Sequence, residues 1–299
     1  MLVSIICNFY NHEKFVSQTI NSFLSQKKNF EFEILLHDDC SNDSTPNILR
    51  EFENYYPNLI KVIYQKENQY LKGINVWTEI QFPRAKGKYI ALCDGDDYWT
   101  DPYKLQKQVD YLENNPDCAF TCHSVHILNE SGNAIPWKVF EKAKEIILTE
   151  DIIKAHFIPT LSLVFRTSIV NKIPSWFNKI QSGDIALELI LSTYGYGFYF
   201  FNNMGVYRFS GSGITITYSL EFYKFIQNKI YLYCKFNEFS NNKFKEILNN
   251  RIIAIISYYV KNNSSDSKLK ILINSLYLLK DLLDKKYLIK ALKLIMKNL

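Results

Sequence analysis

The segment K-Y-I-A-L-C-D-G-D-D-Y-W, residues 88–99, joins a short apolar run to an abrupt group of acids. The apolar residues have the character of a buried β-strand, and Asp94, Asp96 and Asp97 follow at its end. Crowding like charges within a few residues costs free energy unless a divalent ion or a hydrogen-bonded ligand compensates them. The segment therefore predicts a strand whose carboxyl end forms part of a binding site.

An earlier segment has the same design. The residues E-I-L-L-H at 33–37 precede Asp38 and Asp39, which are followed by C-S-N-D-S-T at 40–45. In open α/β sheets, ligands bind beyond the carboxyl ends of parallel strands. We therefore expect the two acidic strand ends to border one cleft.

Strand-like and helix-like segments alternate through the first half of the chain. The run at residues 2–7 is apolar almost throughout, as in a parallel strand that is buried on both faces. The alternation predicts an α/β fold with a mixed, mainly parallel central sheet flanked by helices. Further strands are expected at residues 32–37, 60–64 and 89–93, and helices at residues 15–24, 45–56, 74–80 and 103–114.

The chain changes character twice along its length. Beyond residue 118 the alternation loosens, with strands expected near residues 119–128 and 162–166. Beyond residue 218, Gly and Pro give way to Lys, Leu, Ile, Asn and Tyr in long helical runs. We therefore expect a first domain at residues 1–217, with halves at 1–100 and 101–217, and an α-helical C-terminal region at 218–299.

The composition is that of a globular protein. Of the 299 residues, 47% are hydrophobic and 15% are aromatic, which allows a sizeable core. The net charge of +5 permits attraction to anionic ligands but gives no reason to expect nucleic acid as a partner. Six cysteines in apolar contexts, and no cleavable apolar leader after Met1, indicate a reducing cytoplasm. Cys118 and Cys122 lack a second cysteine pair, so core thiols are favoured over a zinc site.

The last thirty or so residues, 269–299, form a lysine-rich amphipathic pattern. No stretch reaches the roughly 18 to 20 uncharged apolar residues that a transmembrane helix needs. Two interpretations remain open, a helix pair packed on the first domain and a basic helix that lies on anionic lipid. The two can hold together, and the second predicts peripheral binding at the inner face of the cytoplasmic membrane.

Five motifs, taken in their order, resemble those of the family 2 glycosyltransferases, which have the GT-A fold. The resemblance covers roughly residues 1–215 and makes the expected fold a GT-A sheet with a helical extension. The motifs are V-S-I-I-C-N-F-Y-N-H at 3–12, D-D-C-S-N-D-S-T at 38–45, K-G-K-Y-I-A-L-C-D-G-D-D-Y-W at 86–99, S-G-D-I-A-L-E-L-I-L-S-T-Y-G at 182–195 and V-Y-R-F-S-G-S-G at 206–213.

The resemblance implies a nucleotide-sugar donor and assigns a role to each acid of the two strand ends. By position, Asp39 is expected to contact the nucleobase, with Asp38 in support, and Asp94 to face the ribose. Asp96 takes the place of the metal-binding acid of the family's D-x-D motif, so it is expected to bind Mg²⁺ or Mn²⁺. Asp97 is expected either to support the metal site or to contact the sugar.

The later motifs supply the expected catalytic base and a cation. Asp184 is expected to take the proton from the acceptor hydroxyl as that oxygen attacks, in a single in-line displacement that inverts the anomeric centre. Arg208 is expected to meet the diphosphate. The chain departs from the family at Gly183, where members often have Glu before the base, and at Ser210, where relatives often have His.

These residues lead us to expect an inverting, metal-dependent hexosyltransferase that uses a nucleotide-sugar, most readily a UDP-linked one. The expected acceptor is a glycan or a lipid-linked oligosaccharide in surface-polysaccharide, lipooligosaccharide or protein-glycan biosynthesis. The alternative is a catalytically degenerate protein that binds nucleotide-sugar or acts as a membrane scaffold. A nucleotidyltransferase is disfavoured because no Gly-rich phosphate loop lies between Asn8 and Lys14.

Overall fold

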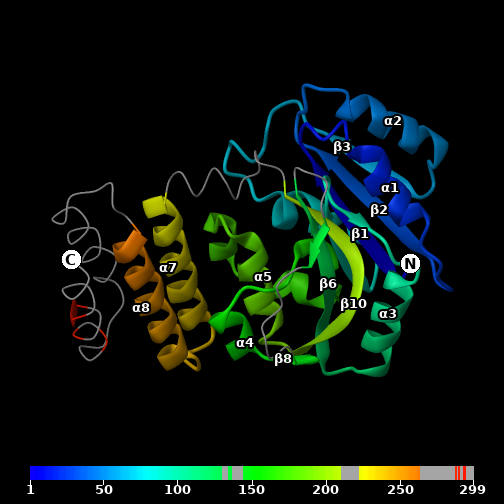
Figure 1. Ribbon diagram of the computed structural model, residues 1–299. Helices are drawn as coiled ribbons and strands as arrows, with labels where there is room; N and C mark the ends of the chain where they lie inside the picture. The colour runs from blue at the N-terminus through cyan, green and yellow to red at the C-terminus, as the bar shows by residue number, and fades with distance from the viewer. Residues whose placement is uncertain are drawn as a thin grey trace. The chain divides into compact units, whose positions relative to one another are not determined.

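The computed structural model describes residues 1–129, 134–136, 144–209 and 222–262, together with Tyr287, Ile289, Leu292 and Lys293 (Figure 1). The boundary expected between residues 217 and 218 lies outside these residues. The chain divides into two compact units. The first comprises Met1–Leu148, Phe157–Lys179 and Leu191–Ser210, and the second comprises Thr149–His156, Ile180–Ile190 and Gly211–Leu299.

Four parallel strands form one half of the sheet of the first unit, in the order β3-β2-β1-β4. Strands β1 and β2 are buried along nearly their whole length, as expected for apolar runs that are covered on both faces. This topology confirms the mainly parallel sheet that the sequence predicts. The strands are β1 (Val3–Phe9), β2 (Phe32–Asp38), β3 (Ile60–Tyr64) and β4 (Tyr89–Asp94).

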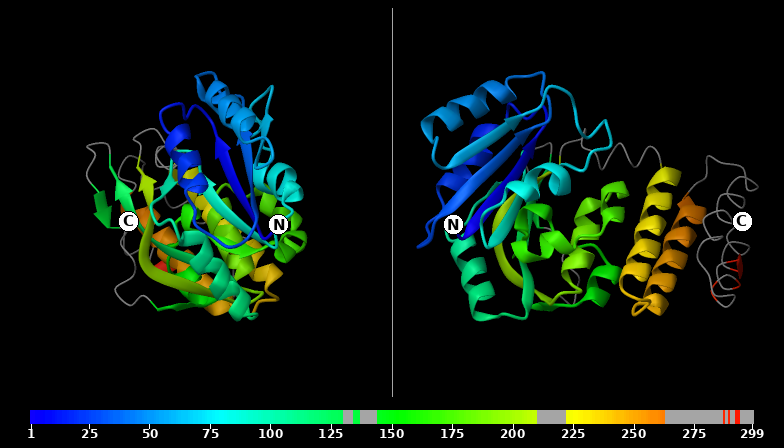
Figure 2. Two further views of the ribbon diagram at one scale, coloured as in Figure 1. Left: turned by 90° about the vertical axis from the view of Figure 1, so that its right-hand side faces the viewer. Right: turned by 180° about the vertical axis from the view of Figure 1, so that it is seen from behind.

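Helices pack against this sheet through the apolar face of each helix. Helix α1 (Val16–Leu24) buries Val16, Thr19, Ile20 and Phe23, which recur at helical spacing. It contacts α2 (Thr45–Tyr55), while α3 (Lys104–Asn114) packs on β6 (Cys118–Leu128) (Figure 2). The segment expected to be helical before Pro83 is a π-helical turn, Val76–Gln81, followed by a 3₁₀ turn, Phe82–Arg84.

The other half of the sheet is mixed and contains the long strand β10 (Tyr196–Arg208). Strand β9 (Val164–Arg166) runs antiparallel between β4 and β6, and β10 pairs in parallel with β6 (Cys118–Leu128). Strand β5 (Tyr98–Trp99) pairs antiparallel with β10, so that Val206 lies opposite Tyr98. This pairing brings the end of β10 beside the acids that precede β5. Two short strands, β7 (Ala134–Pro136) and β8 (Ile146–Ile147), pair with β6 and β10.

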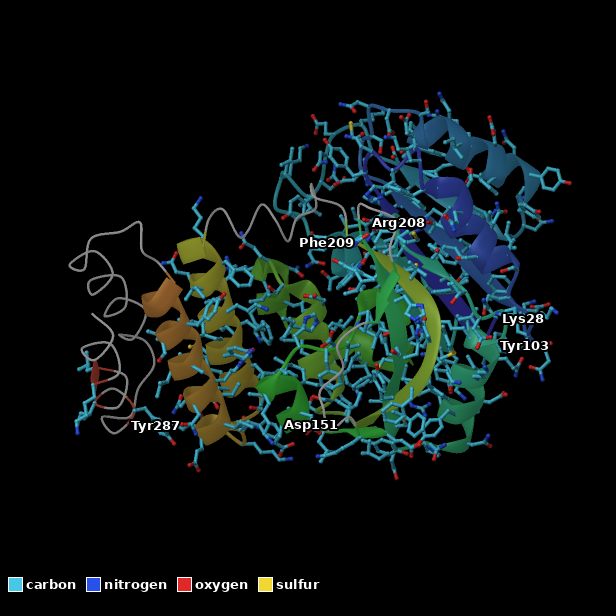
Figure 3. The ribbon with its side chains drawn as sticks, viewed as in Figure 1. Lys28, Tyr103, Asp151, Arg208, Phe209 and Tyr287 are labelled. Atoms are coloured by element: carbon cyan, nitrogen blue, oxygen red, sulfur yellow. The ribbon has the colours of Figure 1, made fainter. Side chains whose placement is uncertain are left out.

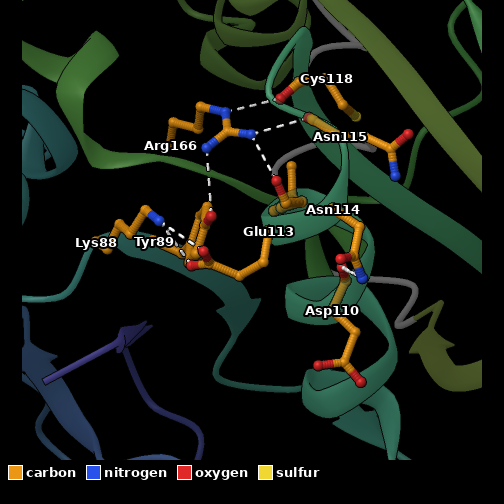
Figure 4. Close-up of polar contacts among 9 residues, drawn as sticks. Lys88, Tyr89, Asp110, Glu113, Asn114, Asn115, Cys118 and Arg166 are labelled. Atoms are coloured by element: carbon orange, nitrogen blue, oxygen red, sulfur yellow. Dashed lines mark hydrogen bonds and ion pairs between the residues drawn. The ribbon is translucent and has the colours of Figure 1, made fainter.

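Arg166 joins the two halves of the sheet at the amino end of β4 (Figure 4). Its guanidinium donates hydrogen bonds to the carbonyl oxygens of Leu112, Asn115 and Cys118, at 2.7, 3.0 and 2.8 Å, and to Tyr89 Oη at 3.3 Å. The last carbonyls of a helix lack intrahelical partners, so a cation at the end of α3 satisfies groups that would otherwise be unpaired. Arg166 therefore stabilises the end of the sheet opposite the acidic strand ends.

The second unit is mainly helical where it is described. It contains α4 (Thr149–Lys154), most of α5 (Gly183–Leu191), α7 (Phe222–Phe239) and α8 (Lys245–Asn262). Helix α8 contacts both α7 and α4, and α7 buries Ile226, Ile230, Tyr233 and Phe236 at helical spacing. These helices confirm the expected C-terminal helical region as far as residue 262. Among the described residues, no helix is long and apolar enough to span a membrane.

Candidate active site

The two acidic strand ends lie on either side of β1. The register pairs Phe9 of β1 with Asp38 of β2, and Asn8 of β1 with Asp94 of β4. Because all three strands run in parallel, their carboxyl ends meet at one edge of the sheet. The structure thus brings together the two acidic groups that the sequence places more than fifty residues apart.

Asp39 holds the loop that follows β3. Its side chain is buried, with Oδ1 accepting from the Gln69 N–H at 2.7 Å and Oδ2 accepting from the Tyr70 N–H at 3.1 Å. The amide of Asn68 adds a bond to the Asp39 carbonyl oxygen at 3.1 Å. A carboxylate has about four lone-pair sites, so Asp39 retains the capacity to accept from a further N–H. Its contact with a nucleobase remains a prediction.

Asp38 is buried, as Asp39 is. Its Oδ2 accepts from the Ser41 N–H at 3.3 Å, while Oδ1 has no hydrogen-bond partner within the described part of the chain. Burial raises the pKa of Asp38, although the bonds from Ser41 oppose this shift. This position fits the supporting role expected of Asp38.

The D-G-D-D turn that follows β4 is fixed to the end of β1. The N–H of Gly95 donates to the Asn8 carbonyl oxygen at 3.1 Å, and the N–H of Asp97 donates to the Asp94 carbonyl oxygen at 3.1 Å. A Cβ atom at Gly95 would lie 2.5 Å from both the Asn8 carbonyl oxygen and the Phe9 ring, so the turn requires glycine. Asp94 and Asp96 remain half-buried at the surface of this turn.

Asp97 points into the protein, unlike Asp94 and Asp96. Its side chain is fully buried, and Oδ1 accepts from the main-chain N–H of Arg208 at 2.8 Å. Its other oxygen, Oδ2, has no hydrogen-bond partner among the described residues. Burial, followed by the charges of Asp96 and Asp94, raises the pKa of Asp97 well above its usual range. This side chain holds the turn to the end of β10, and both roles expected for Asp97, support of the metal site and contact with the sugar, remain predictions.

Thr19 of α1 is a component of the site that the sequence does not reveal. Its hydroxyl is buried and lies 2.7 Å from the carbonyl oxygen of Asp97, 3.1 Å from that of Gly95 and 3.1 Å from that of Phe15. A hydroxyl has one proton to donate, and the shortest distance favours Asp97. Because threonine is common on apolar helix faces, nothing in the spacing of α1 distinguishes this residue.

Arg208 ends β10 beside the D-G-D-D turn (Figure 3). Its guanidinium donates to the carbonyl oxygen of Asp96 and to Oε1 of Gln18, and it lies 4.6 Å from the ring centroids of both Phe15 and Tyr98. Burial lowers the pKa of Arg208, while the neighbouring Asp97 and Asp96 raise it. A cation therefore stands next to the expected metal ligand, and its contact with a diphosphate remains a prediction.

The donor set of the turn fits a cation of the expected kind. Within the described ranges, no three His, Cys, Asp or Glu side chains form a cluster that could hold a metal ion. Mg²⁺ ordinarily binds through one or two carboxylates together with substrate phosphates, so it needs no complete protein cage. Half-buried Asp96, with Asp94 beside it on the same turn, offers hard oxygen ligands of this type.

Two further cations of the sequence lie elsewhere. Arg84 donates to the carbonyl oxygens of Leu36 and Lys61, at 3.2 and 3.0 Å, and to Gln81 Oε1 at 2.7 Å. Its guanidinium thus links strands β2 and β3. Lys72 forms an exposed ion pair with Glu67.

A cavity in the first unit is lined by none of the expected site residues. It has a volume of about 460 Å³ and lies between the turns around Phe82 and the segment at residues 167–178. Its lining mixes Pro83, Pro174 and Ile173 with Thr78 and Asn178. We assign it no part in the chemistry.

The cysteines at the site differ in their surroundings. Cys7 and Cys93 face each other in the register of β1 and β4, and both are buried. Burial, followed by neighbouring charges that include Asp94 and Asp97, raises the pKa of both thiols well above the usual range.

Cys40 directly follows Asp39, is partly exposed and has a φ of 64°, the left-handed region that a turn requires here. Cys118 and Cys122 are buried core thiols, as expected.

Asp184 belongs to the second unit and lies in the first turn of α5. Its side chain is 33% exposed, and Oδ2 lies 3.6 Å from Nε2 of His156. The same nitrogen lies 3.2 Å from Oε1 of Glu188, one turn further along α5. The acid that the family often has at position 183 is thus absent, but a different acid, Glu188, lies beside the same histidine as Asp184.

The arrangement defines a class of protein. An α/β sheet that is parallel in one half, with acids beyond β2 and β4 and a mixed half that ends in β10 beside them, is the architecture of the GT-A transferases. A family model described as "Glycosyl transferase family 2" matches residues 4–172. The chain belongs to glycosyltransferase family 2.

Individual relatives agree with this family. The chain is 30% identical to the putative teichuronic acid biosynthesis glycosyltransferase TuaG of Bacillus subtilis, over 72% of this chain and 81% of that protein. It is 33% identical to an uncharacterized protein of Mycobacterium tuberculosis over 55% of this chain, but it spans only 46% of that longer relative. The crystal structure of S. aureus TarS 1-349 in complex with UDP-GlcNAc has a TM-score of 0.67 at 16% identity, over all of this chain and 89% of that one. The likeness to TarS supports the fold.

Proposed function

We propose that the protein transfers a sugar, with inversion, from a UDP-linked donor to a hydroxyl of a glycan or a lipid-linked glycan. The observation that carries this proposal is the pair of acidic strand ends on either side of β1, with Arg208 beside the second of them. The UDP-GlcNAc complex of TarS supports a UDP-linked donor, and the printed name of TuaG supports an acceptor in surface-polysaccharide synthesis.

Each residue of this edge has a proposed task toward the donor. Asp39 accepts from an N–H of the nucleobase, on a loop that it holds in place, and Asp94 accepts from the ribose hydroxyls. Asp96 binds Mg²⁺ or Mn²⁺, and Arg208 meets the diphosphate. When bound, the ion neutralises the diphosphate and stabilises its departure from the sugar. Asp38 and Asp97 are buried, and their proposed task is to stabilise the two acidic turns through hydrogen bonds to main-chain N–H groups.

Asp184 is the proposed base of the transfer. Its carboxylate takes the proton of the acceptor hydroxyl while that oxygen forms its bond to the anomeric carbon and the bond from this carbon to the diphosphate breaks. General-base assistance of this kind contributes about 10²- to 10⁴-fold to a rate. We therefore expect Asp184→Asn to leave donor affinity unchanged and to lower kcat by about that factor.

The test is nucleotide binding followed by transfer. Melting temperatures are measured with UDP, GDP, CDP and TDP and with their common sugars, in Mn²⁺, Mg²⁺ or EDTA. We expect stabilisation by one UDP-sugar in the presence of metal only. Asp96→Asn should abolish the metal-dependent stabilisation, whereas Asp110→Asn, the same change at an exposed acid of α3, should retain it. The absence of any nucleotide effect on the wild-type chain would instead support a degenerate scaffold.

We also propose that the protein attaches to the inner face of the cytoplasmic membrane through its lysine-rich segment at residues 269–299. Residues 269–299 carry this expectation, and apart from Tyr287, Ile289, Leu292 and Lys293 they lie outside the described part of the chain. The proposal rests on the sequence pattern, in which lysines flank an apolar helix face.

A further inference from the structure

A group of titratable side chains lies next to Asp184 within the second unit. His156 follows α4, and Asp184 and Glu188 stand four residues apart on α5, so that both carboxylates project from the same side of that helix. His156 Nε2 lies 3.2 Å from Glu188 Oε1 and 3.6 Å from Asp184 Oδ2. One ring nitrogen therefore faces two carboxylates.

The two carboxylates are in different environments. The Glu188 side chain is only 1% exposed, and its Oε2 has no hydrogen-bond partner among the described residues. A buried carboxylate is costly unless it is paired with a cation. Asp184 is 33% exposed and is therefore accessible to a substrate. Glu188 is thus placed to hold the His156 ring through a hydrogen bond, and Asp184 is placed to take a proton from a substrate.

The charges of the group depend on one another. Burial raises the pKa of Glu188 to about 7, against the opposing effect of His156. Burial also lowers the pKa of His156, but the charge and hydrogen bond of Glu188, together with the charge of Asp184, outweigh this and raise it. Lys229 of α7 also faces the group, and burial lowers its pKa.

The two contacts of His156 differ in length, which makes one a hydrogen bond and the other an interaction between charges. At 3.2 Å, an Nε2–H donates a hydrogen bond to Glu188, whereas 3.6 Å to Asp184 is too long for a good hydrogen bond but short for two opposite charges. The proton stays with the buried pair, and the positive charge of the ring lies next to the exposed acid.

We propose that His156, held in place by Glu188, is a positioning residue that sets its positive charge against the Asp184 carboxylate and orients that carboxylate toward the acceptor. The inference rests on the proposed function, because it gives Asp184 the task of taking a proton. In the transfer step, the acceptor proton moves to Asp184, and the proton on His156 remains in its bond to Glu188. The exposed acid thereby keeps a cationic neighbour although the residue before it is glycine.

The activity test is the pH profile of kcat/KM for His156→Gln, which keeps an N–H donor but cannot carry the charge. An opposite charge within about 4–6 Å favours the ionised form of an acid by about one pH unit or more. We expect the acid limb of the profile to move upward by about one pH unit. At pH values below the acid limb, kcat/KM of the variant is then about tenfold lower than that of the wild-type chain. On the plateau the two values are equal. His126→Gln, the same change at an exposed histidine of β6, should leave the profile unchanged.

A purely structural histidine would give a different result. In that case His156→Gln would lower kcat/KM by the same factor at every pH, and an unshifted acid limb overturns the inference while the proposed function stands. If the wild-type chain transfers no sugar from any nucleotide, the proposed function itself fails, and the positioning role fails with it.

A second readout needs no transfer activity. The chain has five histidines, and labelling them with ¹³C gives one ring signal each, of which the one absent from His156→Gln belongs to His156. Glu188→Gln removes the neighbouring carboxylate, so we expect the titration midpoint of His156 to fall by about one pH unit or more. An unchanged midpoint overturns the pairing on which the inference depends. If His156→Gln does not fold, the midpoints of all five histidine signals are compared between the wild-type chain and Glu188→Gln, and five unchanged midpoints overturn the pairing.

Discussion

Replacing Thr19 by valine tests whether α1 holds the D-G-D-D turn. Valine has nearly the shape of threonine, so the change removes the hydroxyl from a buried site and leaves the Asp97 carbonyl oxygen without its 2.7 Å partner. A net hydrogen bond contributes about 1 kcal/mol, and an unsatisfied buried carbonyl costs about 1–3 kcal/mol. We therefore expect the free energy of unfolding to fall by about 2 kcal/mol, which is about 3 °C in Tm for a chain of 299 residues.

The same change should weaken donor binding, because the turn carries Asp94 and Asp96. If about 1 kcal/mol of the cost must be recovered when the nucleotide binds, its Kd rises about fivefold. Thermal unfolding and calorimetric titration with a UDP-sugar in Mn²⁺ measure the two effects. Thr19→Ser, which keeps the hydroxyl, should bind the nucleotide like the wild-type chain. A Thr19→Val variant with the Tm and Kd of Thr19→Ser would refute the reasoning.

Three further changes test other parts of the molecule. Arg166→Lys cannot reach three carbonyls at once, so we expect it to lower the free energy of unfolding by about 3 kcal/mol, measured by urea denaturation, with nucleotide affinity unchanged; an unchanged denaturation midpoint would contradict this. The raised pKa of Asp97 means that the folded state binds a proton that the unfolded state has lost, so in EDTA stability should fall as pH rises from about 4 through the folded pKa. Asp97→Asn should remove this component, and equal pH slopes for the two proteins would argue against it. Deleting residues 267–299 should abolish sedimentation with anionic vesicles while leaving nucleotide binding intact; continued sedimentation would exclude this segment as the anchor.

The acids of the donor edge could be predicted because they follow apolar runs directly. The apolar runs of β2 and β4 place Asp38 and Asp94 at strand ends. In a parallel sheet, the carboxyl ends of these strands lie at one edge. The local alternation of strands and helices is sufficient for this step. No information about distant contacts is required.

The partners of those acids could not be predicted from local patterns. Arg208 reaches Asp96 because β10 pairs with both β5 and β6, with register shifts along its length that no periodicity shows. In the sequence, Asp97 does not differ from the other acids of the cluster. Its burial follows only from the packing of β10 beside the turn. His156, just after α4, and Glu188 of α5 show no sign of pairing in the sequence, and their contact follows only from the fold. Likewise, the joining of α4 and α5 to α7 and α8 in one unit depends on packing alone.

The acids at the end of β4 have a consequence for oxidation. Because burial and nearby carboxylates suppress the thiolate form of Cys7 and Cys93, these cysteines are poor targets for peroxide and for alkylating reagents. Cys118 and Cys122 are buried as well, which leaves Cys40 and Cys234 as the partly exposed cysteines of the chain. Cys40 directly follows Asp39, so thiol reagents at the donor edge meet a residue beside the expected nucleobase contact. If Asp39 contacts the nucleobase as proposed, we expect a bound nucleotide to shield Cys40, so that the rate of Cys40 alkylation would report donor occupancy.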